Sequence, residues 1–308
     1  MSNRGGANDG NGGAISFFTN QTNPDSLSIT NSTISNNEAE RSGGAIFVSA
    51  SPTGGTSSIN AVTIVNSTIS GNSAGQIDNN VSISGGNGGG IFVTANTSEG
   101  GTTSLTVDLT NSTIANNTAR GGGKGSLGDA GGVLVDNSTT DVTVTLNINN
   151  TVIANNNQDG TTASADLQTS SVVGLNVKSS LIEDTSTGFG SNTTSGLDAS
   201  VLQQQDPLLG TLADNGGTTM THLPQDGSPL IDAGDSSLAT AASLTLDQRG
   251  ETRVNGASVD IGSVEFTESS TSTTAPTTSS SSSSSSAFSA IWLIGLGLLA
   301  PLMRRRKQ

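Results

Sequence analysis

The chain has 308 residues, of which 40 are glycine, and it contains no cysteine, no tyrosine and a single histidine. Its net charge of −14 excludes the basic footprint that nucleic-acid binding requires, and the lack of cysteine excludes disulfides. A hydrophobic content of 31% is low for an ordinary packed core, but it suffices for a solenoid, in which each turn needs only a narrow apolar stripe.

The chain begins without the apolar stretch of a secretory signal peptide. Its repeat has already started at Gly12, where Gly-Gly-Ala-Ile matches the same four letters from Gly43. Because the first turn of a solenoid normally needs a cap, we expect the natural protein to extend upstream of Met1.

One motif, Asn-Ser-Thr-Ile or a close variant, recurs through the first half of the chain. It starts at Asn31, Asn66, Asn111 and Asn150, and a second asparagine follows six residues later, at Asn37, Asn72, Asn117 and Asn156. The apolar residues four and two before the first Asn alternate with polar ones, as on one face of a strand, but the Ile comes an odd step of five later. Both can face one core only if the chain turns near the Asn, which readily adopts the left-handed conformation of a corner.

This succession predicts one coil of a parallel β-helix, in which equivalent residues stack ~4.8 Å apart. All eight asparagines are predicted to be structural corners whose stacked amides hydrogen-bond in ladders. Asn-x-Ser/Thr also fits an N-glycosylation acceptor, but recurrence at one strand offset favours the corner.

A second landmark, a glycine pair followed by apolar residues, recurs at Gly43, Gly88 and Gly131. If each landmark opens another coil, each repeat period holds about two coils. We expect Ile46 to stack on Ile91 and Phe47 on Phe92. The pattern leaves open which of these alternating side chains points inward.

Residues 1–185 are therefore predicted to be solenoid repeats, and residues 186–266 to be turns and short strands that close the solenoid. The second part contains Asp206-Pro-Leu-Leu-Gly210, Gly227-Ser-Pro-Leu-Ile-Asp-Ala-Gly-Asp235, Asp247-Gln-Arg-Gly250 and Val259-Asp-Ile-Gly-Ser-Val-Glu265. These phrases resemble, in order and spacing, the choice-of-anchor Q domain of bacterial surface proteins, whose repeats are similar to those of polymorphic outer-membrane proteins. The resemblance implies an all-β, right-handed parallel β-helix on an exported protein, and it carries no catalytic residues.

Residues 267–286 form a Ser/Thr-rich linker that is too polar to bury a core. Residues 287–303 carry no charge and precede Arg304-Arg-Arg-Lys307, so residues 287–308 are predicted to be one transmembrane helix with a cytoplasmic basic tail. The tail resembles GlyGly-CTERM sorting signals, although Ala287-Phe288 and serines replace the glycine pair. This implies a sorting protease as partner and a location in the cell envelope, or outside the cell after cleavage.

The sequence shows no clear set of catalytic residues. A polysaccharide lyase needs a basic residue beside carboxylates, and a glycoside hydrolase needs two nearby carboxyls. The basic residues of the repeats fall in loops or near the last repeat, without a matching acidic ladder; they are Arg41, Arg120, Lys124 and Lys178. Asp108 and Asp141 lie on or beside strands at different offsets. His222 has no recognisable serine partner and is expected to be a turn residue.

Four aspartates of the closing block are candidate Ca²⁺ ligands: Asp232, Asp235, Asp247 and Asp260. Capping of turns by these carboxylates is the favoured interpretation, so we expect no cofactor. The sequence predicts a non-enzymatic exported surface protein, an adhesin or carbohydrate-binding scaffold that binds a glycan or cell-surface ligand through its loops. The alternative is a β-helix polysaccharide lyase or glycoside hydrolase with its site in upstream coils.

Overall fold

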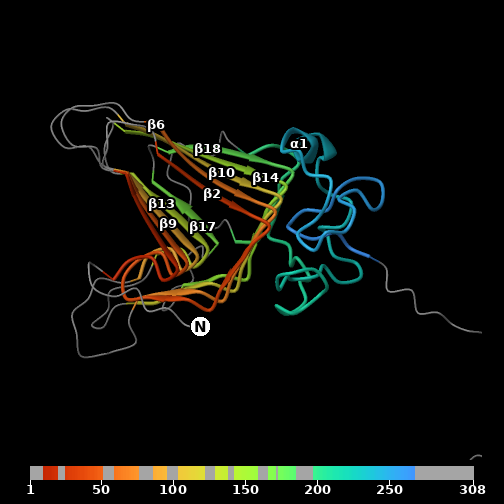
Figure 1. Cartoon of the computed structure of the whole chain (residues 1–308), viewed down its shortest axis with the longest axis horizontal. Helices are drawn as coiled ribbons and strands as arrows, with labels where there is room; N and C mark the ends of the chain where they lie inside the picture. The colour runs from red at the N-terminus through yellow and green to blue at the C-terminus, as the bar shows by residue number, and fades with distance from the viewer. Residues whose placement is uncertain are drawn as a thin grey trace, which may run out of the picture. The chain divides into compact units, whose positions relative to one another are not determined.

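The computed structural model describes residues 10–19, 25–50, 59–75, 86–95, 103–121, 129–137, 142–158, 166–170, 173–184 and 197–267. These residues belong to one compact unit. The described residues form mostly β-strands in parallel sheets, consistent with an all-β fold, and α1 (Ser236–Ala241) is the one helix among them (Figure 1). Apart from residue 267, the predicted linker and transmembrane segment (267–308) lie outside the described residues.

Successive strands enter four parallel sheets in turn and then return to the first. Sheet I contains β1 (Ile15–Thr19), β5 (Ile46–Ala50), β9 (Ile91–Ala95), β13 (Val133–Asp136) and β17 (Leu167–Thr169). Sheet II contains β2 (Ser26–Thr30), β6 (Ile59–Val65), β10 (Thr103–Thr110), β14 (Val142–Asn149) and β18 (Val173–Lys178). Sheet III contains β3 (Thr33–Ser35), β7 (Thr68–Ser70), β11 (Thr113–Ala115), β15 (Val152–Ala154), β19 (Leu181–Ile182) and β20 (Leu202–Gln203). Sheet IV contains β4 (Glu38–Ala39), β8 (Ser73–Ala74), β12 (Thr118–Ala119) and β16 (Asn157–Gln158).

The strand register follows the repeat of the sequence. Ile64 on β6 pairs with Ile29 of the preceding repeat and with Leu109 of the following one, so equivalent residues occupy neighbouring strands. Each repeat period is therefore one circuit of the four sheets, and the expectation of about two coils per period is wrong. The glycine landmark returns the chain to sheet I within the same circuit.

As predicted, the corner at the first asparagine lets the apolar residues on both sides of the motif's odd step face one core. Ile64 precedes Asn66 and Ile69 follows it, and both side chains enter the same core, where they are 0% and 1% exposed. Burial of such a side chain stabilises the fold by about 1.5–3 kcal/mol relative to its exposure. Because this column of isoleucines continues from circuit to circuit, a small apolar fraction holds the whole stack together.

Sheet I buries side chains on both of its faces. Ile46 pairs with Ile91 and Phe47 with Phe92, as predicted. The isoleucines belong to the main core, whereas the two phenylalanines form a separate cluster with Ala130 and Leu134, with the Phe47 and Phe92 ring centroids 5.7 Å apart.

The C-terminal block (residues 206–266) lies along the outer face of sheet III and spans several circuits (Figure 1). Thr33 donates to Met220 O at 2.5 Å, Thr113 Oγ1 lies 3.1 Å from Ser263 Oγ, and Asn150 Nδ2 donates to Asp235 O at 2.9 Å. This flanking position differs from the end-closing role that the sequence suggested. The reason is that the outward Thr of the first three motifs offers the block hydroxyls on the side of the stack, and Val152 of the fourth packs against Leu230 and Ile261 of the block.

Candidate functional site

The Asn-Ser-Thr-Ile motif places its first asparagine at a corner. The backbone φ is 49° at Asn31, 52° at Asn66, 45° at Asn111 and 46° at Asn150, all in the left-handed region. Asn66, Asn111 and Asn150 are at most 1% exposed. In the folded chain these three side chains are therefore not accessible as glycan acceptors.

The second asparagines are not corners, which corrects the sequence prediction for Asn37, Asn72, Asn117 and Asn156. The left-handed residue of the second corner comes one position earlier: φ is 56° at Asn36, 68° at Gly71, 59° at Asn116 and 57° at Asn155. The asparagine that follows this corner directs its side-chain amide along the stacking direction. Asn72 shows the result, because its backbone N–H and Nδ2 both donate to Asn117 Oδ1, at 3.0 and 2.9 Å.

This interior amide ladder runs through four circuits and ends on Asp166. The backbone N–H and Nδ2 of Asn156 donate to Asp166 Oδ1 at 3.1 and 2.8 Å, and the Asp184 N–H donates to Oδ2 at 2.7 Å. Burial raises the pKa of Asp166 to about 7, although the donated hydrogen bonds oppose the shift. Sequence reasoning missed this carboxyl because it replaces the repeated asparagine after a shortened interval of 10 residues.

The serine and the threonine of the motif have separate roles. The backbone N–H of Ser67 donates to Ser112 Oγ at 3.3 Å, and that of Ser112 donates to Thr151 Oγ1 at 3.2 Å, so the serine position links successive circuits. Thr68 Oγ1 points outward and donates to Gln248 Oε1 of the C-terminal block at 2.6 Å. The threonine position therefore holds the block to the stack.

The structure gives His222 a serine partner, contrary to the sequence prediction. Nε2 of His222 lies 2.8 Å from Ser70 Oγ, and Nδ1 lies 2.7 Å from Gly210 O. Because a carbonyl can only accept, Nδ1 carries a proton, and in the neutral ring Nε2 accepts from the serine hydroxyl. Burial lowers the pKa of His222, and each side chain is only 2% exposed. The pair has the contacts of a base and a nucleophile, but its burial beneath the block excludes substrate.

A buried ion pair within the C-terminal block lies against the stack at Asn111. Arg253 Nε is 3.3 Å from Glu265 Oε1, and both side chains are 1% exposed. Arg253 also donates to Gly262 O, and, with the amide oxygen of Asn111 turned toward it, to that oxygen. Burial raises the pKa of Glu265 to about 8, against the opposing effect of Arg253. Neither residue was a sequence candidate, because no periodic pattern marks them.

The four candidate Ca²⁺ ligands bind protein groups. Asp235 caps α1 by accepting from the Ser237 N–H at 2.8 Å, and Asp247 Oδ2 accepts from Arg249. Asp232 and Asp260 lie close together, with Asp260 Oδ1 accepting from the Asp232 N–H at 2.7 Å. Within the described ranges, no three acidic, histidine or cysteine residues are placed to share a metal ion.

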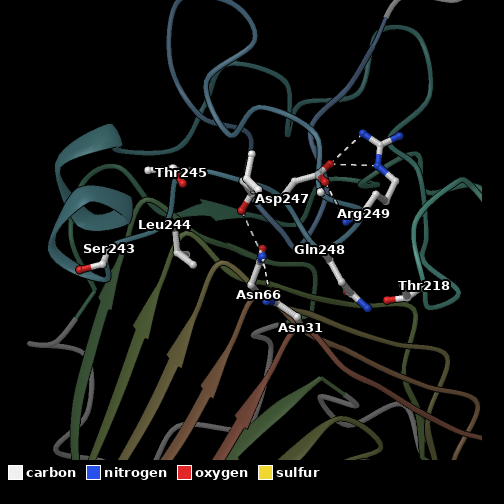
Figure 2. A pocket seen from close by; sticks show the side chains of 11 residues that line it. Asn31, Asn66, Thr218, Ser243, Leu244, Thr245, Asp247, Gln248 and Arg249 are labelled. Atoms are coloured by element: carbon white, nitrogen blue, oxygen red, sulfur yellow. Dashed lines mark hydrogen bonds and ion pairs between the residues drawn. The ribbon is translucent and has the colours of Figure 1, made fainter.

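A pocket of about 390 Å³ lies where the corner asparagines Asn31 and Asn66 face residues 243–250 of the block (Figure 2). The two charged side chains in its lining are paired: Arg249 Nε and Nη2 donate to Asp247 Oδ2 at 2.9 and 2.8 Å. The remaining lining consists of amide, hydroxyl and leucine side chains and the backbone. The pocket therefore offers no unpaired acid or base for catalysis.

The outer face of sheet II is an array of small polar side chains. The strand register aligns Ser28, Thr63, Asp108, Asn147 and Asn176 in one row across the strands. In this Asp108 row, Asn147 Nδ2 donates to Asp108 Oδ1 at 2.7 Å, and Asn176 Nδ2 donates to Asn147 Oδ1 at 2.9 Å. The apolar neighbours Leu175 and Val177 point the other way, into the core.

Of the four basic residues of the repeats, the structure describes Arg41, Arg120 and Lys178, which lie on different sheets or loops. Arg41 follows β4, and Arg120 Nη1 pairs with Glu38 Oε1 at 2.9 Å. Lys178 ends β18 on sheet II. Lys124 and Asp141 lie outside the described residues.

Among the described residues, no helix has the length and apolar character needed to cross a membrane. No protein-family model, curated protein or solved structure that was compared matches this chain.

Proposed function

We propose that this chain is a non-enzymatic bacterial surface protein that binds carbohydrate on the outer face of sheet II. Its scaffold is a right-handed parallel β-helix of the kind found with choice-of-anchor Q domains. Parallel pairing in every sheet, with one circuit per sequence repeat, supports this architecture. The rigid stack presents side chains without taking part in chemistry.

The observation that carries the binding proposal is the row of hydrogen-bonded polar side chains on sheet II. Short hydroxyl, amide and carboxylate groups at fixed spacing complement sugar hydroxyls, which both donate and accept. The groups best suited to catalysis support the non-enzymatic part, because Ser70 and His222 are buried and Asp247 and Arg249 are paired with each other.

Delivery to the surface is part of the proposal. The uncharged residues 287–303 anchor the chain in the membrane, the basic residues after them stay in the cytoplasm, and a sorting protease releases or transfers the protein. Cell fractionation tests this step: recovery of the full chain from the soluble cytoplasm would contradict it.

The binding proposal is tested by incubating the full chain with a panel of soluble and insoluble polysaccharides. We expect co-sedimentation or retarded migration with at least one polysaccharide, without release of reducing sugars or unsaturated products. Product release would support the lyase or hydrolase alternative, and the absence of binding across the panel would refute the carbohydrate proposal.

A further inference from the structure

In the Asp108 row, the side chains of Asp108, Asn147 and Asn176 are hydrogen-bonded to one another. Two hydrogen bonds run in the same direction, from Asn176 to Asn147 and from Asn147 to Asp108. The neighbouring row contains Ser26, Ala61, Thr106, Thr145 and Gly174, whose side chains are too short to form such a chain.

Each of the three hydrogen-bonded side chains keeps unused hydrogen-bond donors or acceptors. A primary amide has two donors and two acceptor positions, and the ladder uses one of each on Asn147. The remaining N–H and the remaining lone pair of Asn147 lie side by side on one planar group. Two adjacent sugar hydroxyls can engage such a group as one donor and one acceptor.

The ladder also fixes the orientation of these amides before a ligand arrives. Immobilising a flexible polar side chain on binding costs conformational entropy, and a preformed ladder avoids part of that cost. Equivalent groups repeat at the strand spacing of ~4.8 Å, which is close to the advance per sugar in an extended polysaccharide. A chain lying across the strands would therefore meet successive amides with successive sugars.

Charge restricts the class of polysaccharide. The protein carries a net charge of −14, and the Asp108 carboxylate terminates the ladder. An acidic polysaccharide would face repulsion at this row, whereas an uncharged one would not.

We propose that the Asp108 row is a binding site for an uncharged polysaccharide with free neighbouring hydroxyls, which lies along the row and across the strands. This assignment rests on the proposed carbohydrate-binding function and names its contact residues and ligand class.

The test measures the affinity of the full chain for galactomannan and mixed-linkage β-glucan as uncharged probes, and for polygalacturonate as the acidic probe. Asn147→Ala and Asn176→Ala remove ladder members, and Thr145→Ala is the matched control on the same face and strand as Asn147. We expect each ladder variant to bind an uncharged probe at least tenfold more weakly than the wild type, while Thr145→Ala changes affinity less than threefold. Urea unfolding midpoints of all variants serve as the folding control, and Asn176→Ala, which removes only one ladder hydrogen bond, stands in if Asn147→Ala fails to fold.

The outcomes separate this assignment from the proposed function. Wild-type affinity in both ladder variants overturns the Asp108 row as the site but leaves carbohydrate binding intact. Tighter binding to polygalacturonate than to both uncharged probes overturns the ligand class. No binding of any polysaccharide by the wild-type chain overturns both proposals.

Discussion

Ser70 and His222 are 152 positions apart in the sequence, yet Ser70 Oγ lies 2.8 Å from His222 Nε2 beneath the C-terminal block. This contact joins the second circuit of the stack to the flanking block, and burial of the imidazole favours its neutral form by lowering its pKa. The pair resembles catalytic chemistry in its contacts but functions as a polar anchor, because neither side chain reaches solvent.

His222 should make the fold sensitive to acid. Burial lowers its pKa, so the folded state prefers the neutral form, and stability is fully present above the unfolded pKa of ~6.5 and falls as pH drops below it. We expect His222→Gln to reduce stability at neutral pH but to flatten its dependence between about pH 6.5 and pH 5. Urea midpoints of the full chain across this range measure the slope, with Ser70→Ala as the control that keeps the titrating ring. An unchanged slope in His222→Gln would rule out this origin of acid sensitivity.

Asp166 should lower the stability of the fold as pH rises, which is the opposite of the effect of His222. Its pKa is raised to about 7 by burial, so the folded state prefers the protonated carboxyl, and stability declines as pH rises from the unfolded pKa of 3.8 through 7. Asp166→Asn keeps an oxygen to accept from Asn156 but cannot ionise. Relative to wild type, this variant should gain stability between pH 5 and pH 8. Thermal unfolding at these two pH values checks the prediction, and an equal difference from wild type at both would contradict it.

Removal of the Arg253 side chain should destabilise the fold by an amount that depends on pH. Arg253→Ala leaves Glu265 buried without its ion-pair partner, and loss of one partner of such a pair destabilises by about 3–5 kcal/mol. Because Glu265 already has a pKa of about 8, it should be protonated in the variant at pH 6, where the loss is smaller than at pH 9. The double variant Arg253→Ala/Glu265→Gln should recover stability mainly at pH 9. Chemical denaturation at both pH values measures this, and the same penalty at each would argue against an ionised Glu265.

Asn116 should tolerate glycine but not valine. It is exposed, its φ is 59°, and Gly71 occupies the equivalent corner of the preceding circuit. Asn116→Gly should change stability by about 1 kcal/mol or less, whereas Asn116→Val should cost about 1–2 kcal/mol because a β-branched residue is strained in the left-handed region. Guanidinium unfolding compares the two variants. Equal stability of both would show that the corner conformation imposes no constraint at this position.

The local structure of the repeats could be predicted from the sequence because the repeat period and the spacing of apolar residues constrain the backbone. The odd step between Ile64 and Ile69 requires a corner, and only a residue that accepts positive φ can provide one. The predicted position of the second corner is wrong by one residue, since both candidates are asparagine at Asn116 and Asn117, and Gly71 is the local signal for the residue that bends. The number of circuits per period was also misjudged, because a glycine landmark marks a return to sheet I and not a new coil.

Spacing along a single repeat is enough to predict the parallel all-β stacking, the first corners and the columns of core residues. The position of the C-terminal block and the polar residues that it buries depend on contacts between distant parts of the chain. His222 meets Ser70 through long-range docking of the block onto sheet III. Arg253 pairs with Glu265 inside the block, and no local periodicity records either contact. The Asp108 row depends on register across three strands, so its amides became a candidate site only once those strands were aligned.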